Sequence, residues 1–237
     1  MEKAIRVAIL DSVPEVYWAD DLGITDAQKF IDLMQPFNKA ARFDTYFTSM
    51  NQFPESTDCF DAILVTGSPC SVHDDLDWIR KLMELIRRVA DAGMPVIGSC
   101  FGHQLVAKVF GGEVGNNEQG WMIGNYAVQI TRNYDWMEPA ASVTGLYHFN
   151  QERVIRLPET AIAFARTDDC SDFGFTIGEN VMCFQGHPEQ PKRAMLNFLR
   201  AIDGLSEVEL TRANSYIEQG EPDADTWAQW MMRFYLS

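Results

Sequence analysis

Short apolar runs alternate along the chain with longer amphipathic segments. Strand-sized apolar runs in the first half lie at residues 5–10, 42–47, 62–65 and 95–99. From Leu76 to Ala90, apolar residues recur at steps of three and four, which predicts a helix that Gly93 and Pro95 end. Strands that alternate with helices are typical of a parallel sheet covered on both faces. We therefore predict an α/β fold with a mostly parallel central sheet.

The second half of the chain is richer in strand-like runs. These lie at residues 126–131, 154–157, 161–165, 173–177 and 181–184. Apolar residues on one face between Met195 and Ile202 then predict a helix. The segment from residue 11 to about Phe37 shows no clear pattern and is left without an assigned element.

The chain after Gly204 has the features of a small helical extension. Ser206 and Glu209 fit a capping box at the start of a helix. A later helix carries an aromatic stripe formed by Trp227, Trp230, Met231 and Phe234. We divide the chain into a main domain at 1–203 and a C-terminal extension at 204–237, packed on that domain through the stripe. A partner-binding face is the alternative role of the stripe.

Composition and charge narrow the choice of partners. The 237 residues carry 34 acidic and 19 basic side chains, a net charge of −15. Such a surface repels phosphate backbones and anionic lipids, so we expect neither nucleic acid nor a membrane as partner. The five cysteines are odd in number and widely spaced, which favours reduced thiols in the cytoplasm. They form no C-x-x-C pair, and the histidines show no ligand spacing, so we expect no metal and no cofactor.

A candidate nucleophile stands between the fourth apolar run and the following helix. Gly98-x-Cys100-x-Gly102 has the pattern of a nucleophile elbow, in which glycines relieve crowding around a strained turn. The start of the helix favours a thiolate at Cys100. A buried structural cysteine between closely packed glycines is the alternative.

Two further segments complete a catalytic pattern. His187-Pro188-Glu189 follows the run 181–184, and in an extended chain the carboxylate can orient the imidazole. Cys100, His187 and Glu189 together make a nucleophilic triad. Thr66-Gly67-Ser68-Pro69 follows the run 62–65, so backbone N–H groups of this loop and of Phe101 can hold an oxyanion. A simple turn is the alternative for the loop.

In this order and at these separations, the three segments resemble the class I glutamine amidotransferases. The matching segments are Gly67-Ser68-Pro69, Gly98-Ser99-Cys100-Phe101-Gly102-His103-Gln104 and His187-Pro188-Glu189. The resemblance covers about residues 5–203. It implies a three-layer, flavodoxin-like fold and a thioester mechanism on a γ-glutamyl amide. It also assigns Gln104 to substrate contact, whereas we expect a structural role for His103.

Finer features resemble a stand-alone branch that is similar to the glutaminase domain of GMP synthase and includes γ-glutamyl peptidases. Residues 120–124 resemble its G-W-x-x-G segment, and residues 147–158 resemble its S-H-x-D-x-V-x-x-L-P segment. On this basis His148 is placed at the substrate entrance, with a packing role as the alternative. Gly186 replaces a bulkier residue before His187 and is expected to widen the pocket.

The resemblance leaves the substrate open. Free glutamine would release ammonia for a separate synthetase subunit, because the chain contains no synthetase domain of its own. A γ-glutamyl peptide or conjugate would need no partner. A non-catalytic binding or regulatory protein with the same fold is the alternative of a different class, and an intact triad argues against it.

Overall fold

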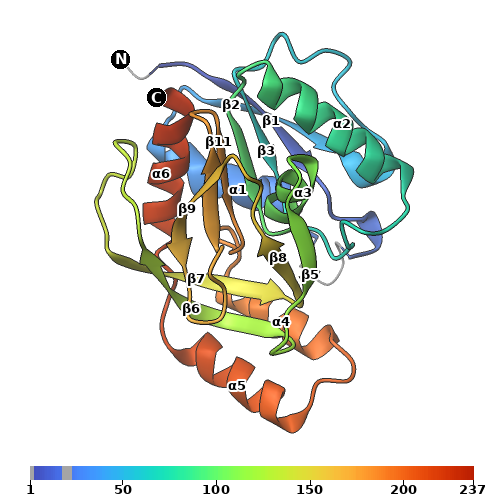
Figure 1. Cartoon of the computed structure of the whole chain (residues 1–237), viewed down its shortest axis with the longest axis vertical. Helices are drawn as coiled ribbons and strands as arrows, with labels where there is room; N and C mark the ends of the chain where they lie inside the picture. The colour runs from blue at the N-terminus through green and yellow to red at the C-terminus, as the bar shows by residue number, and fades with distance from the viewer. Residues whose placement is uncertain (1–2, 18–22) are drawn as a thin grey trace.

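The computed structural model describes residues 3–17 and 23–237, and its centre is a nine-stranded sheet (Figure 1). The strand order is β2-β1-β3-β4-β11-β10-β9-β6-β7. The bounds are β1 Arg6–Asp11, β2 Arg42–Phe47, β3 Ala62–Val65, β4 Val96–Ser99, β6 Met122–Ile130, β7 Val143–Asn150, β9 Ala161–Arg166, β10 Gly174–Ile177 and β11 Val181–Phe184. A separate antiparallel pair joins β5 Glu113–Asn116 to β8 Glu152–Arg156.

The first five strands in this order are parallel. Strands β3, β4 and β11 are buried at every position, as expected for strands covered on both faces. In register, Val65 of β3 pairs with Gly98 of β4, and Ser99 pairs with Phe184 of β11. The three strands therefore end at nearly the same level, and the loops that follow them start side by side.

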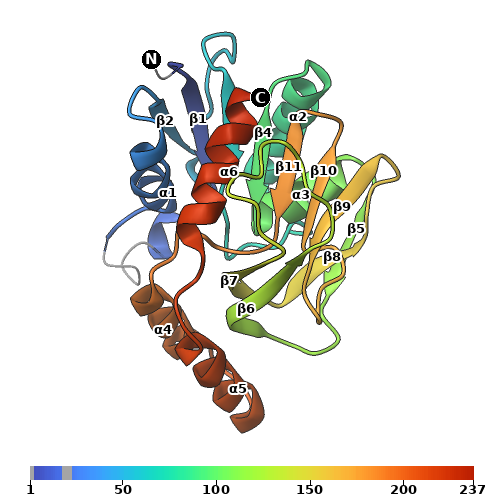
Figure 2. The same ribbon diagram turned by 90° about the vertical axis from the view of Figure 1, so that its left-hand side faces the viewer.

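Helices cover both faces of this parallel part (Figure 2). Helices α1 Asp26–Met34 and α6 Ala224–Leu236 lie on one face, with Phe30 and Met34 in the same core cluster as Trp227. Helices α2 Asp77–Asp91 and α3 Phe101–Val109 lie on the other face and pack through a second cluster. This arrangement confirms the α/β class and the helices on both faces of the sheet.

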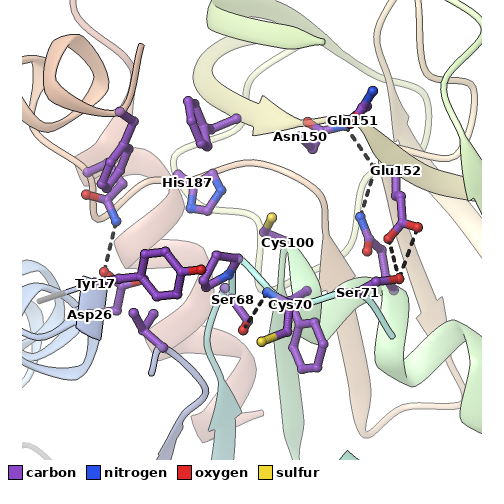
Figure 3. Close-up of a pocket in the computed structure, with 18 of the residues that line it drawn as sticks. Tyr17, Asp26, Ser68, Cys70, Ser71, Cys100, Asn150, Gln151, Glu152 and His187 are labelled. Atoms are coloured by element: carbon purple, nitrogen blue, oxygen red, sulfur yellow. Dashed lines mark hydrogen bonds between the residues drawn. The ribbon is translucent and has the colours of Figure 1, made fainter. Parts of the chain in front are cut away.

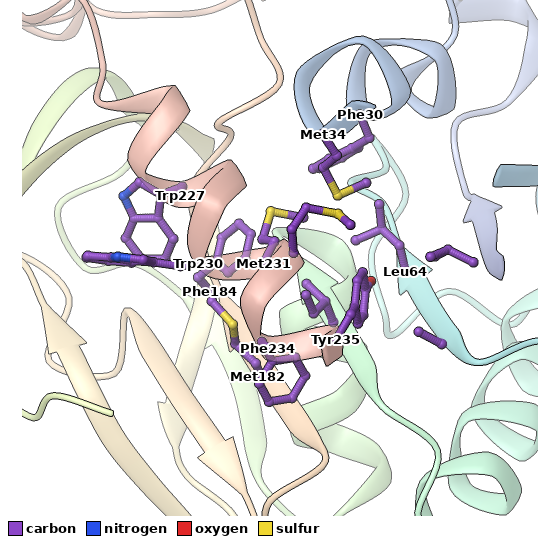
Figure 4. Close-up of a cluster of buried hydrophobic side chains, with 14 of the residues drawn as sticks. Phe30, Met34, Leu64, Met182, Phe184, Trp227, Trp230, Met231, Phe234 and Tyr235 are labelled. Carbon is purple, nitrogen blue, oxygen red and sulfur yellow. The ribbon is translucent and has the colours of Figure 1, made fainter. Parts of the chain in front are cut away.

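The aromatic stripe of the C-terminal segment lies inside the main core (Figure 4). Trp227 and Trp230 are fully buried, and the Trp227 ring lies 4.9 Å from that of Phe184 on β11. The Tyr235 hydroxyl donates to the carbonyl oxygen of Ile63 on β3. Helix α6 thus belongs to the layer of helices that covers one face of the sheet. It is part of the main core, whereas the sequence predicted an extension that packs on the outside of the main domain.

The other half of the sheet is antiparallel and carries two projecting helices. Helix α4 Lys192–Ala201 follows the sheet, and α5 Glu207–Glu218 packs against β6 (Figure 2). At the β6 contact, a Cβ on Gly124 would lie 2.4 Å from Cβ of Tyr216, so only glycine fits there. Helix α5 begins with the predicted capping box of Ser206 and Glu209.

The helices and the cysteines show two further properties of the fold. None of the helices in the described ranges combines the length and the apolar character that crossing a bilayer requires. All five cysteines are free thiols, and Cys100, Cys170 and Cys183 are buried.

Candidate active site

Cys100 stands in a strained turn between β4 and α3. Its backbone has φ 50° and ψ −104°, and it is one of two described non-glycine residues with positive φ. Its N–H donates to the carbonyl oxygen of Phe184 on β11, at 3.0 Å. Helix α3 begins at the next residue, so the thiol lies at the helix N-terminus, the partially positive end of the helix.

The two glycines of the elbow are required by close backbone packing. A Cβ on Gly98 would lie 2.7 Å from the carbonyl of Gly102, and a Cβ on Gly102 would lie 2.5 Å from the carbonyl oxygen of Val65. Neither approach leaves room for a side chain. Glycine at both positions is therefore required to bring Cys100 close to the end of β3.

His187 and Glu189 form the second part of the site. Nδ1 of His187 lies 2.8 Å from Oε1 of Glu189, and the Glu189 side chain is fully buried. The backbone N–H of His187 donates to the carbonyl oxygen of Tyr147 on β7. Nε2 of His187 is buried and has no hydrogen-bond partner among the described residues, so this atom is available for a proton from the thiol.

The surroundings of His187 favour its protonated form. Burial alone would lower the pKa of His187, but the negative charges of Cys100 and Glu189 outweigh this effect and raise the pKa well above its ordinary value. A raised pKa keeps a proton on the imidazole of His187, beside Cys100.

A buried polar network continues from Glu189 towards α1. Nζ of Lys29 lies 2.7 Å from Asp26 and 3.0 Å from the side-chain oxygen of Gln190, and Gln190 in turn donates to Asp26 and Glu189. Burial, together with the charges of Glu189 and Asp11, raises the pKa of Asp26 well above its ordinary value. Burial also lowers the pKa of Lys29 to about 8. This network could not be predicted from the sequence, because charged residues usually indicate a solvent-exposed helix face.

The loop after β3 lies against the triad. A Cβ on Gly67 would lie 3.0 Å from Cε1 of His187 and 3.7 Å from Cβ of Cys100. The carbonyl oxygen of Gly67 accepts a hydrogen bond from the Thr66 hydroxyl, and the Ser68 hydroxyl donates to the carbonyl oxygen of Ser12. Because the Gly67 carbonyl is held, the N–H of Ser68 in the same trans peptide points to the opposite side.

A single cavity of about 560 Å³ contains these groups (Figure 3). Cys100, His187, Gly67, Ser68 and Phe101 all line it, so the structure brings together five predicted site residues from three separate segments. Among the described residues that line the cavity there is no lysine or arginine. Two lining residues, Asp26 and Glu152, carry carboxyl groups, and His187 contributes an imidazole.

Polar side chains fix one side of the cavity. The Ser71 hydroxyl donates to the Glu152 carboxylate, and the Gln104 amide donates to the Glu152 carbonyl oxygen at 2.8 Å. Gln104 also donates to the side-chain oxygen of Gln185, whose own amide lies 3.4 Å from Sγ of Cys100. Gln104 thus lies at the cavity, as predicted, while the contact of Gln185 with the thiol was not predicted.

His148 does not lie at the substrate entrance. It is fully buried, its ring stacks on Phe173 at 4.9 Å, and burial lowers its pKa to about 3. Counting back from Val154, the S-H-x-D-x-V pattern places its histidine at Asn150 and its aspartate at Glu152. Both of these residues line the cavity. Aligning the pattern on Val154 would therefore have identified Asn150 and Glu152 from the sequence.

Two neighbours of the catalytic residues also face the core. A Cβ on Gly186 would lie 3.0 Å from the Phe173 ring and 3.2 Å from Cβ of Leu146, so this glycine eases core packing and does not widen the pocket. His103 is fully buried beside Phe175, and its Nε2 lies 3.1 Å from the carbonyl oxygen of Asp172. This placement agrees with the structural role expected for His103.

Comparisons with known proteins agree with this architecture. Over 205 residues, the chain is 29% identical to γ-glutamyl peptidase 3 of Arabidopsis thaliana, which covers 81% of this chain and 82% of that protein. It is 30% identical over 142 residues to the GMP synthase (glutamine-hydrolyzing) of Aeropyrum pernix, covering 60% of this chain and 27% of that protein. A glutamine amidotransferase crystal structure from Thermotoga maritima shares the fold, with a TM-score of 0.73 and 19% identity over 99% of this chain and 97% of that one. The family model described as glutamine amidotransferase class-I matches residues 38–200, more than half of the chain. The chain belongs to the class I glutamine amidotransferase family.

Proposed function

We propose that this chain hydrolyses a γ-glutamyl amide through a thioester on Cys100. The observation that carries the proposal is the strained Cys100 elbow, which shares one cavity with His187, whose ring is hydrogen-bonded to Glu189. A nucleophile, a base and a group that orients the base are the elements of covalent acyl transfer. A purely binding protein would need none of them.

In the proposed first step, Sγ of Cys100 attacks the amide carbonyl carbon. The N–H groups of Phe101 and of the loop at Gly67 and Ser68 hold the developing oxyanion. His187 gives its proton to the amide nitrogen as the C–N bond breaks, and the amine or ammonia departs. His187 then takes a proton from water, which attacks the thioester and releases glutamate with the thiol restored.

The polar side of the cavity is the proposed site of the glutamyl group. Glu152 would bind the α-ammonium group, because a carboxylate is the natural partner of a cation in a partly buried site. Gln104 would contact the glutamyl chain from the same side. With no cationic side chain among the described lining residues, the α-carboxylate would rely on backbone N–H groups.

We propose that the reaction needs no synthetase subunit. The match to γ-glutamyl peptidase 3 spans 82% of that protein, whereas the match to the Aeropyrum GMP synthase spans 27% of that one. Five free thiols fit a reducing compartment, and we place the enzyme in the cytoplasm.

Glutamate release by the purified chain alone tests the proposal. L-glutamine and γ-L-glutamylmethylamide are the substrates, and we expect turnover that C100S abolishes. C59S is the matched control, because Cys59 is an exposed thiol outside the cavity. Equal activity of C100S and the wild type would refute the triad. Turnover of glutamine only after a synthetase is added would favour the amidotransferase alternative.

A further inference from the structure

The cavity has two sides, and Cys100 lies between them (Figure 3). Ser71, Gln151 and Glu152 lie on one side, whereas His187 and Asp26 lie on the other. The acid that protonates a leaving nitrogen must lie beside that nitrogen. If the glutamyl group occupies the Glu152 side, as the proposed function requires, the leaving amine departs on the side of His187 and Asp26.

A row of three aromatic rings lines the cavity and begins near Asp26. Phe198 of α4 lies near the Asp26 side, because Nζ of Lys29, which bonds to Asp26, is 6.0 Å from the centre of the Phe198 ring. The Phe198 ring lies 5.1 Å from that of Phe149, which in turn lies 5.5 Å from Trp121. All three rings line the cavity, together with Ala201 and Ile202 of the same region. We call Trp121, Phe149 and Phe198 the aromatic wall.

The cavity has room for a leaving group larger than ammonia. Ammonia is about as large as a water molecule, which occupies ~30 Å³ in the liquid. A cavity of about 560 Å³ lies within the ~300–1,000 Å³ range of sites that enclose whole organic ligands. An aromatic wall beside the leaving group would contribute nothing to the binding of ammonia.

Charge on this side opposes an anionic leaving group. The lining carboxyl group here is that of Asp26, and its partner Lys29 is already shared between Asp26 and Gln190. The neighbouring His187 is already bonded to Glu189. An amino acid that leaves with a free carboxylate would place it beside these carboxyl groups, with no lysine or arginine among the described lining residues to pair with it. Burial of an unpaired carboxylate is strongly unfavourable.

We propose that the preferred substrates are γ-glutamyl amides of uncharged aromatic or apolar amines. The proposal rests on the proposed function and specifies its leaving group. The amide C–N bond breaks as the Cys100 thioester forms, and the amine leaves with the proton from His187. Water then cleaves the thioester, so one amide and one water give glutamate and the free amine.

Three synthetic amides separate the contributions of the ring and the carboxylate. γ-L-glutamylphenethylamide and γ-L-glutamyl-L-phenylalanine differ only in the carboxylate of the leaving group, and γ-L-glutamylmethylamide lacks the ring. All three are alkyl amides of similar intrinsic reactivity. With the purified full chain, we expect kcat/KM for the phenethylamide to exceed both of the others by about tenfold or more, as for apolar groups in a fitted pocket.

The F198A variant tests whether the aromatic wall is responsible. We expect the phenethylamide-to-methylamide ratio of kcat/KM to fall towards one, while continued methylamide hydrolysis shows that the variant is folded. R200A is the matched control, because Arg200 is an exposed residue on α4 outside the cavity. It should keep the wild-type ratio.

The outcomes distinguish the two proposals. Equal kcat/KM for the phenethylamide and the methylamide, or a preference for γ-L-glutamyl-L-phenylalanine, would overturn the leaving-group proposal and leave the hydrolase function intact. An unchanged ratio in F198A would overturn the role of the aromatic wall. Failure to hydrolyse any of the three amides or glutamine would overturn the proposed function itself.

Discussion

Backbone conformation distinguishes Cys100 from the other four cysteines. Cys183 is also buried next to the site, on β11, but it lies in a regular strand, and burial raises its pKa. Cys100 instead has positive φ, the start of a helix behind it and an amide N–H of Gln185 directed at its sulfur. These three features place the sulfur at the turn and surround it with N–H groups, and the regular strand provides none of them.

The charge of Glu189 controls the protonation of His187. In the proposed mechanism the leaving amine takes its proton from the imidazolium, so activity should be lost as the pH rises through the raised pKa of His187. In E189Q a negative charge is removed, the pKa of His187 falls, and the alkaline limb of kcat/KM moves to lower pH. We also expect kcat/KM to drop by about 10²- to 10⁴-fold, the range typical of general acid–base catalysis.

The pH profile separates this role from a purely structural one. E189D, which keeps the charge, is the control and should keep more of the alkaline activity than E189Q. An alkaline limb at the same pH in wild type and E189Q would contradict the role given to Glu189.

Two buried neutral histidines make the protein sensitive to acid. Burial lowers the pKa of His148 to about 3 and that of His103 to about 4, whereas both titrate near 6.5 when unfolded. Between these values the unfolded chain binds more protons, so stability falls as the pH decreases. Each histidine contributes up to about 1.4 kcal/mol per pH unit to this loss.

H148F removes one of the two contributions. The phenylalanine ring fits the contacts with Tyr126 and Phe173, and neither ring nitrogen of His148 has a hydrogen-bond partner to lose among the described residues. We expect the free energy of unfolding, measured in urea between pH 6.5 and pH 4, to fall less steeply in H148F. The same slope in both proteins would show that His148 is protonated in the fold.

Sequence reasoning predicted the candidate triad residues, two of which, Cys100 and His187, line one cavity, but it misplaced His148 at the substrate entrance. Cys100, His187 and the Gly67 loop each follow an apolar run that ends in glycine or proline, and such runs are visible in a single sequence. His148 was misplaced because a strand alternates its side chains between two faces, and a register fixed on the wrong residue selects the wrong face.

At the scale of elements, the strands of the parallel half were the easiest to predict. The runs at 42–47, 62–65 and 181–184 coincide with β2, β3 and β11. Strand β7 was missed because its alternation includes Gly145 and polar residues. Helix α1 was missed although Thr25 caps it, because Asp26 and Lys29 lie on its buried side.

Helix α6 contributes to stability as part of the main core. Trp227 is fully buried among Phe164, Phe173 and Phe184, and its indole N–H donates to Thr144 at 3.1 Å. W227A should lower the free energy of unfolding by about 3–5 kcal/mol, because it leaves a large cavity. Denaturant unfolding followed by circular dichroism measures this change.

An exposed residue of the neighbouring helix provides the control for W227A. Val208 on α5 is 76% exposed, and V208A should change the stability by less than about 0.5 kcal/mol. A similarly small effect of W227A would mean that α6 is an attachment to a core that is already complete.

At the scale of the whole molecule, the parallel sheet assembles the site from distant parts of the chain. Strands β3, β4 and β11 lie side by side and end together, so the loop at Gly67, the elbow at Cys100 and the segment at His187 meet at one edge. A parallel sheet therefore explains why the three segments are close in space, whereas the spacing of motifs along the chain only indicates that they belong together.

The cavity, like the chain as a whole with its net charge of −15, has more acidic than basic side chains. The described residues that line the cavity include Asp26 and Glu152 but no basic side chain. The proposed glutamyl ammonium group would pair with these carboxyl groups, whereas a leaving group with a carboxylate would find no lysine or arginine beside it. The lack of lysine and arginine among the described lining residues could not be predicted from the sequence, because the fold determines which of the 19 basic residues lie near the site.

Direct detection of the acyl-enzyme tests the central claim. The wild-type protein is mixed with γ-L-glutamylphenethylamide or γ-L-glutamylmethylamide, quenched in acid within the first turnover, digested and analysed by mass spectrometry. We predict one γ-glutamyl group on the peptide that contains Cys100. This group should disappear as free glutamate accumulates. Glutamate release by C100A at the wild-type rate, or a γ-glutamyl group on a different residue, would contradict the mechanism.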